Sequence, residues 1–139
     1  LIHTRIKQKA DKIVFFLDPE AESLDNYPGY SPKSILAHVK TYVEKFYPKE
    51  AIYLKPHPRQ NTQDILNYLK NNWPTHSYRW CETDDFVDLI AQAKEVWGMT
   101  TVCLLMAKRV GRPIKSFQFE RNALGALQSI PHLEQDIIL

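Results

Sequence analysis

Short apolar runs alternate with longer amphipathic stretches along this chain. The runs fall at residues 13–17, 51–54, 77–81, 95–99 and 113–117. The run Ile13-Val14-Phe15-Phe16-Leu17 is apolar throughout, which is typical of a strand buried on both faces of a sheet. The run at 77–81 has the weakest strand pattern of the group. Together these runs predict the strands of a sheet.

The stretches between the runs have the periodicity and the end signals of helices. Apolar residues from Ile35 to Phe46 repeat at intervals of three and four. Before them, Ser31-Pro32 supplies an N-cap and a first-turn proline. Gly111 suits the C-cap of the last helix. The other helices are expected to start at Asn61 or Thr62, at Thr83 as an N-cap, and at Thr100-Thr101.

The alternation of strands and helices predicts the fold class. The connections are too long for hairpins and suit crossover helices, which join parallel strands. We therefore predict an α/β fold, a Rossmann-like doubly wound parallel sheet of about five strands with flanking helices. Residues 1–139 are expected to form a single domain, with a tail from Phe119 that wraps back over it.

Composition and charge narrow the function classes. Hydrophobic residues make up 44% and charged residues 24% of the 139 residues, and the net charge is +2. These values are ordinary for a globular domain. No basic field favours nucleic acid, and no stretch is long and apolar enough to span a membrane. Cys81 and Cys103 match no metal-binding spacing, which favours a reduced, cytoplasmic setting.

Polar residues follow each predicted strand at its carboxyl end. Ligands of open parallel sheets bind at this edge, so a shared site is expected there. The long segment from Asp18 to Tyr30 fits either a functional loop or an insertion with solvated carboxylates. The residues at this edge are Asp18, His57, Arg59, Glu82, Gly98, Thr100, Thr101 and Gln118.

The turn after the second strand reads Lys55-Pro56-His57-Pro58-Arg59. Each proline favours an extended backbone at the residue before it. His57 therefore follows the strand on a conformationally restricted backbone, with a cationic residue on each side. This arrangement could present His57 to an anion at the mouth of a cleft. A histidine in a proline-rich turn is also often a plain loop residue, and its place at the ligand edge favours the first interpretation.

The segment Gly98-Met99-Thr100-Thr101 has the features of a phosphate site. A glycine allows close approach of the backbone, and two hydroxyls stand at a helix N-terminus whose N–H groups have no helical partner. With His57 on a neighbouring loop, one phosphate could be held from two sides. The alternative is an ordinary helix cap, since threonine is common at that position.

Other candidates carry less information. Glu82, with Asp84 and Asp85, could bind a ribose or could simply form a capped helix start. Trp80 and Trp97 could stack on a base or belong to the core. There is no dinucleotide fingerprint, P-loop, nucleophile elbow or metal cluster, so neither a metal nor a cofactor is expected. A Ser-His-Asp hydrolase is therefore not supported.

The order of these motifs resembles a known family. A strand followed by Lys55-Pro56-His57-Pro58-Arg59, then Gly98 to Thr101 at a helix start, then Leu-Leu-Met-Ala and Gly-Arg-Pro-Ile, resembles the C-terminal nucleotide-binding domain of GT-B glycosyltransferases. The pattern is most similar to bacterial sialyltransferases of the lipooligosaccharide and polysialic acid type, over most of residues 12–118. One departure is the threonine pair, where serines are common in that family.

The resemblance implies transfer of sialic acid from CMP-sialic acid to bacterial surface glycans of lipooligosaccharide or capsule. In that family, the His-Pro histidine and the paired hydroxyls contact the donor phosphate, which places His57 as the catalytic donor or general acid. The other expected nucleotide-binding residues are Lys55, Pro58, Arg59, Gly98, Thr100, Thr101, Glu82 and Asp18.

The resemblance also implies what lies outside the chain. The family's catalytic base belongs to an N-terminal Rossmann-like domain, and the sequence begins at Leu1 rather than methionine. We therefore expect an incomplete piece of a two-domain enzyme that cannot turn over alone. The expected partners are a nucleotide sugar and a glycan acceptor. The expected location is the cytoplasm, at the inner face of the bacterial inner membrane, with peripheral association through the full-length protein left open.

Other functions are compatible with part of this sequence pattern. A transferase for CDP-glycerol or another activated nucleotide, or half of a sugar-nucleotide epimerase, would use a similar phosphate grip. A non-catalytic flavodoxin-like module, such as a receiver domain, would need an acidic pair after the first strand and an aspartate after the third. Asp18-Pro19 and Cys81-Glu82 fit that requirement poorly.

Overall fold

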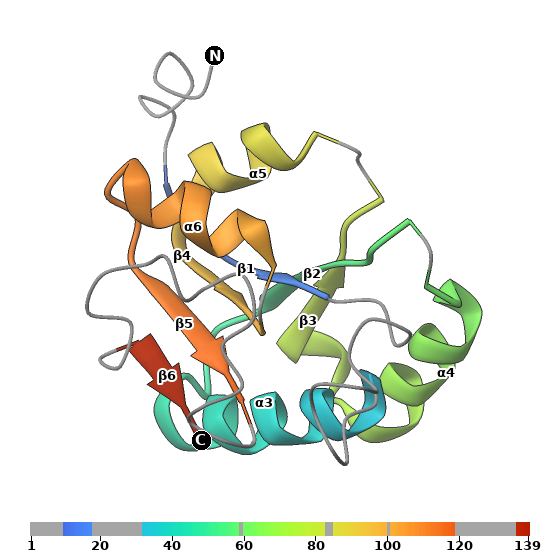
Figure 1. Cartoon of the computed structure of the whole chain (residues 1–139). Helices are drawn as coiled ribbons and strands as arrows, with labels where there is room; N and C mark the ends of the chain where they lie inside the picture. Colours follow the sequence, from blue (N-terminus) through green and yellow to red (C-terminus); the bar gives the residue numbers. More distant parts are fainter. Residues whose placement is uncertain (1–9, 18–31, 59, 83–84, 100, 119–135) are drawn as a thin grey trace.

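The computed structural model describes residues 10–17, 32–58, 60–82, 85–99, 101–118 and 136–139. In these residues a sheet lies between two layers of helices (Figure 1). The strands are β1 (Lys12–Phe16), β2 (Ile52–Lys55), β3 (Tyr78–Trp80), β4 (Ala93–Gly98), β5 (Ile114–Phe117) and β6 (Ile137–Ile138). The helices are α3 (Pro32–Phe46), α4 (Thr62–Asn72), α5 (Phe86–Gln92) and α6 (Val102–Arg109), with a 3₁₀ turn η1 (Thr75–Ser77).

The six strands form one sheet in the order β3-β2-β1-β4-β5-β6, and every neighbouring pair is parallel. This is the strand order of a doubly wound Rossmann fold, so the predicted fold class is confirmed. All five predicted strands are present. The sequence did not predict β6, because a two-residue edge strand has no periodic pattern of its own.

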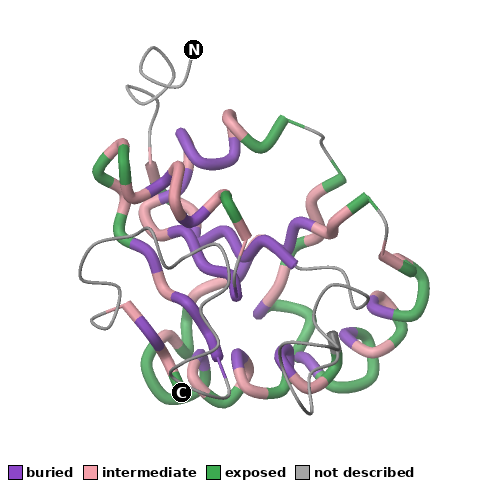
Figure 2. Tube along the Cα trace, viewed as in Figure 1, coloured by how far each residue is buried: buried purple, intermediate pink, exposed green. Residues whose placement is uncertain are grey.

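Helices cover both faces of the sheet (Figure 1). One core lies on the α3 and α4 side and contains Ile13, Phe15 and Trp97, while Val14 and Phe16 face the second core, on the α5 and α6 side. This alternation follows from the two-residue period of a strand. Both faces of β1 are therefore buried, and the central strands are coloured mostly purple, for buried, in Figure 2. This burial on both faces explains why residues 13–17 are all apolar.

Helix ends were predicted with mixed success. The side chain of Thr101 accepts the Cys103 N–H and caps α6, as predicted. The C-cap is Val110 rather than Gly111, and Gly111 follows it with φ +84°. The Thr83 cap is wrong. Helix α5 begins later, and its N-cap is Asp85, whose Oδ1 accepts the Asp88 N–H at 2.9 Å. Aspartate and threonine are both favoured N-cap residues, with aspartate the stronger, so the cap signal was present but was assigned two residues too early.

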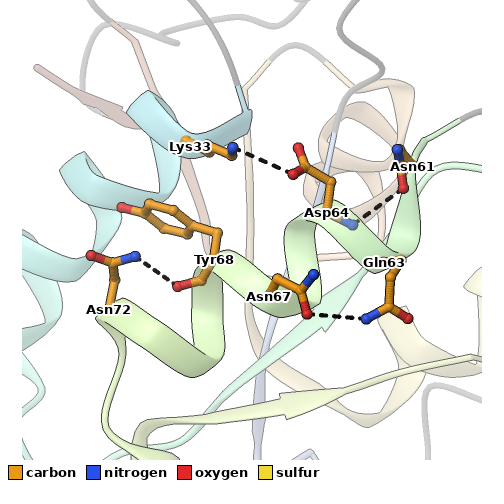
Figure 3. Close-up of polar contacts among 7 residues, drawn as sticks. All are labelled: Lys33, Asn61, Gln63, Asp64, Asn67, Tyr68 and Asn72. Atoms are coloured by element: carbon orange, nitrogen blue, oxygen red, sulfur yellow. Dashed lines mark hydrogen bonds and ion pairs between the residues drawn. The ribbon is translucent and has the colours of Figure 1, made fainter.

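The start of α4 is fixed by polar contacts beside the His57 turn. Asn61 Oδ1 accepts the Asp64 N–H at 3.2 Å, and the Asp64 carboxylate pairs with Lys33 of α3 at 3.4 Å (Figure 3). The same view shows Asn72 Nδ2 donating to the Tyr68 carbonyl near the end of α4, at 2.8 Å. The exposed ion pair contributes little energy, but the cap sets where the turn before α4 ends.

The topology reverses direction beside β1. Strand β1 lies between β2 and β4, and the crossovers change faces there, from α3 and α4 to α5 and α6. Because the connections on the two sides run over opposite faces, they diverge beyond the carboxyl ends of β1 and β4 and leave a crevice. The fold therefore directs a ligand to the ends of β1, β2 and β4.

Candidate functional site at the carboxyl edge of the sheet

A cavity of about 300 Å³ lies at this crevice. This volume is at the lower end of the range for small-molecule sites. Its walls come from the end of β1, the turn after β2, and the starts of α5 and α6. The lining residues are Phe16, Leu17, Lys55, Pro56, His57, Pro58, Phe86, Thr101, Val102 and Cys103.

A second hollow, of about 240 Å³, lies on the other side of the His57 turn. It shares the segment from Lys55 to Pro58 with the first cavity and adds Thr62, Trp80 and Glu82. The His57 turn is thus a wall common to both hollows. A ligand that spans the two would have its middle part next to the imidazole.

The His57 turn is held by two hydrogen bonds to one residue. The His57 N–H donates to Gln60 Oε1 at 2.7 Å, and the Gln60 N–H donates to the His57 carbonyl at 3.0 Å. At its base, the Leu17 N–H donates to the Lys55 carbonyl at 3.0 Å and continues the pairing of β1 with β2. The histidine therefore stands on a closed turn attached to the central strand.

Lys55 brings a positive charge to the same place. Its side chain is only 9% exposed, and its Nζ donates to the Pro56 carbonyl at 3.0 Å. Burial raises the pKa of the Cys81 thiol, while the charges of Lys12 and Lys55 act in the opposite direction. Cys81 is therefore a protonated thiol near neutral pH and does not supply a thiolate nucleophile.

The end of β4 packs closely against the start of α6. A Cβ on Gly98 would lie 2.9 Å from Thr101 Cγ2 and 3.3 Å from the Phe16 carbonyl oxygen. Contacts within the chain are thus enough to require glycine at this position, whether or not a ligand approaches. The Thr101 hydroxyl accepts the Cys103 N–H at 3.3 Å and retains its own hydrogen for donation.

A buried polar pair supports the segment after β4 from the side of β5. Ser116 Oγ donates to the Met99 carbonyl at 2.6 Å, and Gln118 Nε2 donates to Ser116 Oγ at 2.7 Å. Both side chains are fully buried. The Gln118 N–H also donates to the Ile138 carbonyl at 2.9 Å, which ties β6 to the same network. Residues far apart in sequence thus fix the strand end that leads into α6.

The structure brings together several of the predicted site residues. Lys55, His57, Pro58 and Thr101 line the larger cavity, and Glu82 lines the smaller one. Gly98 lies at the end of β4, in contact with Thr101. The predictions for Asp18, Arg59 and Thr100 lie outside the described residues.

The two tryptophans proposed as stacking residues lie in different environments. Trp97 is fully buried, so of its two alternatives the core position is the one observed. Trp80 lines the smaller hollow. Phe86 was not among the site residues expected from the sequence. Phe86 is 41% exposed and borders the larger cavity, because it is the first residue of α5 and precedes the turn that packs on the sheet.

A second polar cluster lies on the α3 side of the sheet, around Glu95 of β4. Its Oε1 accepts hydrogen bonds from Lys115 Nζ at 2.8 Å, Trp97 Nε1 at 3.2 Å and Tyr47 Oη at 3.3 Å. Burial by itself would raise the pKa of Glu95, but these hydrogen bonds and the Lys115 charge outweigh it and hold that pKa below its usual range. The hydrogen bonds of this cluster are all made within the chain, which indicates a structural role.

The described part of the chain has neither a cluster of metal-binding side chains nor a membrane-spanning helix. No group of three or more histidine, cysteine, aspartate or glutamate side chains there could hold a metal ion. Within those same residues, no helix has the length and apolar character needed to cross a bilayer.

The comparisons with known proteins give a structural likeness. No protein-family model matches the chain, and no curated protein matches its sequence. Among solved structures, the chain is similar to KpsC of Thermosulfurimonas dismutans, described as a beta Kdo 2,4 transferase, with a TM-score of 0.54 and 15% identity. The match covers 81% of this chain and 35% of that chain. At this identity the likeness establishes the shared fold.

Proposed function

We propose that this chain is the nucleotide-sugar-binding domain of a glycosyltransferase. The observation that carries the proposal is the convergence of His57 and Thr101 on one cavity at the reversal point of a Rossmann-like sheet. A histidine on a rigid turn and a capped helix N-terminus are both suited to an anion. The buried cation of Lys55 adds positive potential without a metal, and we propose no cofactor.

The proposed donor is a CMP-activated acidic sugar, with CMP-sialic acid as the predicted case. KpsC is described as a transferase of Kdo, which like sialic acid carries a carboxylate on its anomeric carbon. Such a donor brings a carboxylate and a phosphate close together, and both are negatively charged. Lys55 and His57 border both hollows and could meet these charges. The proposed acceptor is a bacterial surface glycan, such as lipooligosaccharide or capsule.

In the proposed reaction, the bond between the anomeric carbon and the phosphate oxygen breaks while an acceptor hydroxyl oxygen bonds to that carbon. Negative charge develops on the departing phosphate. His57 donates a hydrogen bond or a proton to it, and the Thr101 hydroxyl with the first N–H groups of α6 shares the charge. The hydroxyl proton passes to a base that we expect outside this chain.

The remaining predicted residues have supporting roles in this proposal. Glu82 in the smaller hollow is kept as a proposed contact of the nucleotide-sugar donor, and Pro58 stiffens the His57 turn. Asp18, Arg59 and Thr100 are kept as proposed nucleotide contacts. A second Rossmann-like domain would supply the acceptor site, and this chain spans only 35% of the KpsC chain. We propose a cytoplasmic location at the inner membrane, with peripheral association through the full-length protein.

Titration of the isotope-labelled chain with CMP, UMP and GMP, followed by NMR, tests the proposal. We expect CMP to bind most tightly and to shift amide signals of Lys55, His57 and Val102 to Leu104. The phosphate grip is independent of the base, so UMP and GMP should shift the same signals at higher concentration. An absence of shifts at saturating CMP, or shifts confined to another face of the sheet, would refute the proposal.

A further inference from the structure

Phe86 is an exposed aromatic ring at a fixed position. Helix α5 is anchored by Leu89, Ile90 and Ala91, which are buried, and its start is set by the Asp85 cap. Phe86, the first helical residue, remains 41% exposed. The buried residues of the next turn hold α5 in place, so the ring stands at a fixed position beside the cavity.

Two exposed apolar side chains border the larger cavity. In the described part of the chain, large apolar side chains are exposed at Phe46, Phe86, Val102 and Leu139, and two of these, Phe86 and Val102, line that cavity. Val102 is 57% exposed and opens α6, next to Thr101. Exposed apolar surface beside polar groups is typical of a ligand site rather than of a solvated helix end.

Within the described residues, the Phe86 ring makes no contact with another aromatic ring. The ring pairs among the described residues involve the core on the α3 side, around Tyr42, Trp97 and Phe117, or the pair of Trp73 with Tyr78. Phe86 takes part in none of the ring contacts of these residues. Its face is therefore not engaged by another ring of the described chain and can receive a planar group from a ligand.

We propose that Phe86 forms an aromatic subsite that stacks on the nucleobase of the bound nucleotide. This inference rests on the proposed nucleotide function, and it adds a residue and a contact that no sequence motif assigned. The cavity provides the two chemistries that a nucleotide needs. His57, Lys55 and Thr101 suit the phosphate, while Phe86 with Val102 offers apolar surface to the base. Stacking tolerates different bases, because every base has a π face.

Two ligands and three variants test this subsite. CMP and ribose 5-phosphate share the sugar and the phosphate, and only CMP carries a base. Phe86→Ala should weaken CMP binding by roughly 5- to 150-fold and leave ribose 5-phosphate binding unchanged. Phe86→Trp should retain the affinity for CMP. Phe46→Ala removes a ring that is 55% exposed and does not line the cavity, so it should change neither affinity.

The outcomes separate this inference from the function on which it rests. If the wild-type chain binds neither ligand, the nucleotide function fails and the subsite fails with it. If wild type binds both ligands equally well, the phosphate site stands and the base subsite is overturned. The subsite is also overturned if Phe86→Ala binds CMP like wild type or weakens both ligands to the same extent. Amide spectra of each variant verify that the fold is intact.

Discussion

Two polar regions of the same sheet differ in how their charges are used. Around Glu95, one carboxylate oxygen accepts hydrogen bonds from Lys115, Trp97 and Tyr47. At the carboxyl edge, His57 and Lys55 line a cavity of about 300 Å³, and Lys55 forms no ion pair with any described carboxylate. The first region is closed by its own side chains, whereas the second borders an open cavity.

The difference indicates which region serves stability and which serves binding. A buried carboxylate with several donors is held by the fold and in turn holds the strands together. A cation beside an open cavity adds little to folding and can attract an anion. Substitutions in the two regions should therefore have opposite profiles, with large stability effects around Glu95 and large affinity effects around His57.

The largest effect is expected for Glu95→Ala. The substitution leaves Lys115 largely buried without its carboxylate partner, and the free energy of unfolding should fall by about 3 kcal/mol. Urea denaturation followed by circular dichroism measures the loss. Glu44→Ala removes the carboxylate of an exposed pair with Lys40 and should cost less than about 0.5 kcal/mol. Equal losses for the two variants would contradict the structural role of Glu95.

The next effect concerns affinity at the cavity. His57→Ala should weaken CMP binding by about 10- to 150-fold, because a charge-assisted hydrogen bond to phosphate is lost. Binding of cytidine, which lacks the phosphate, should change little, and so should the unfolding free energy. His76→Ala, at an exposed residue of the η1 turn, is the matched control and should leave CMP binding unchanged. Equal weakening of CMP and cytidine by His57→Ala would mean that His57 does not face the phosphate.

A smaller effect is expected for Ser116, which connects stability with binding. Ser77→Ala removes a 2.7 Å hydrogen bond from a buried serine to the Pro74 carbonyl and should lower the unfolding free energy by about 1 kcal/mol. Ser116→Ala removes the 2.6 Å hydrogen bond to the Met99 carbonyl and also the acceptor of the buried Gln118 Nε2, so it should lower that free energy by about 2 kcal/mol. Only Ser116→Ala should also weaken CMP binding, because it supports the segment leading to α6. Similar CMP affinities for both variants would show that Ser116 acts on stability alone.

The smallest effect is the pH dependence of the Glu95 cluster. The folded pKa of Glu95 is lowered, so its contribution to stability is present above the unfolded pKa of about 4.3. The contribution is lost as pH falls through the lower, folded pKa. Urea denaturation at pH 7 and at steps down to pH 3 measures this loss. Glu95→Gln should show a shallower decline than wild type below about pH 5, and parallel curves would argue against the shift.

Sequence reasoning located much of the candidate site through local signals. The Lys55-to-Pro58 turn, the Thr101 cap and Glu82 each follow a predicted strand, and the parallel topology then brings them to one edge. Phe86 was missed because exposure at the first turn of a helix depends on what that turn packs against. Periodicity alone assigns such a ring to the buried face.

The sequence by itself determined the strands, most helix starts and the doubly wound class, because apolar periodicity and caps act within a few residues. Only the tertiary structure decided which strands are neighbours, and therefore which distant side chains meet. Ser116 reaches the Met99 carbonyl because β5 lies beside β4, and Glu95 reaches Lys115 for the same reason. Likewise, the ends of β1 and β2 and the start of α6 enclose one cavity because β1 lies between β2 and β4.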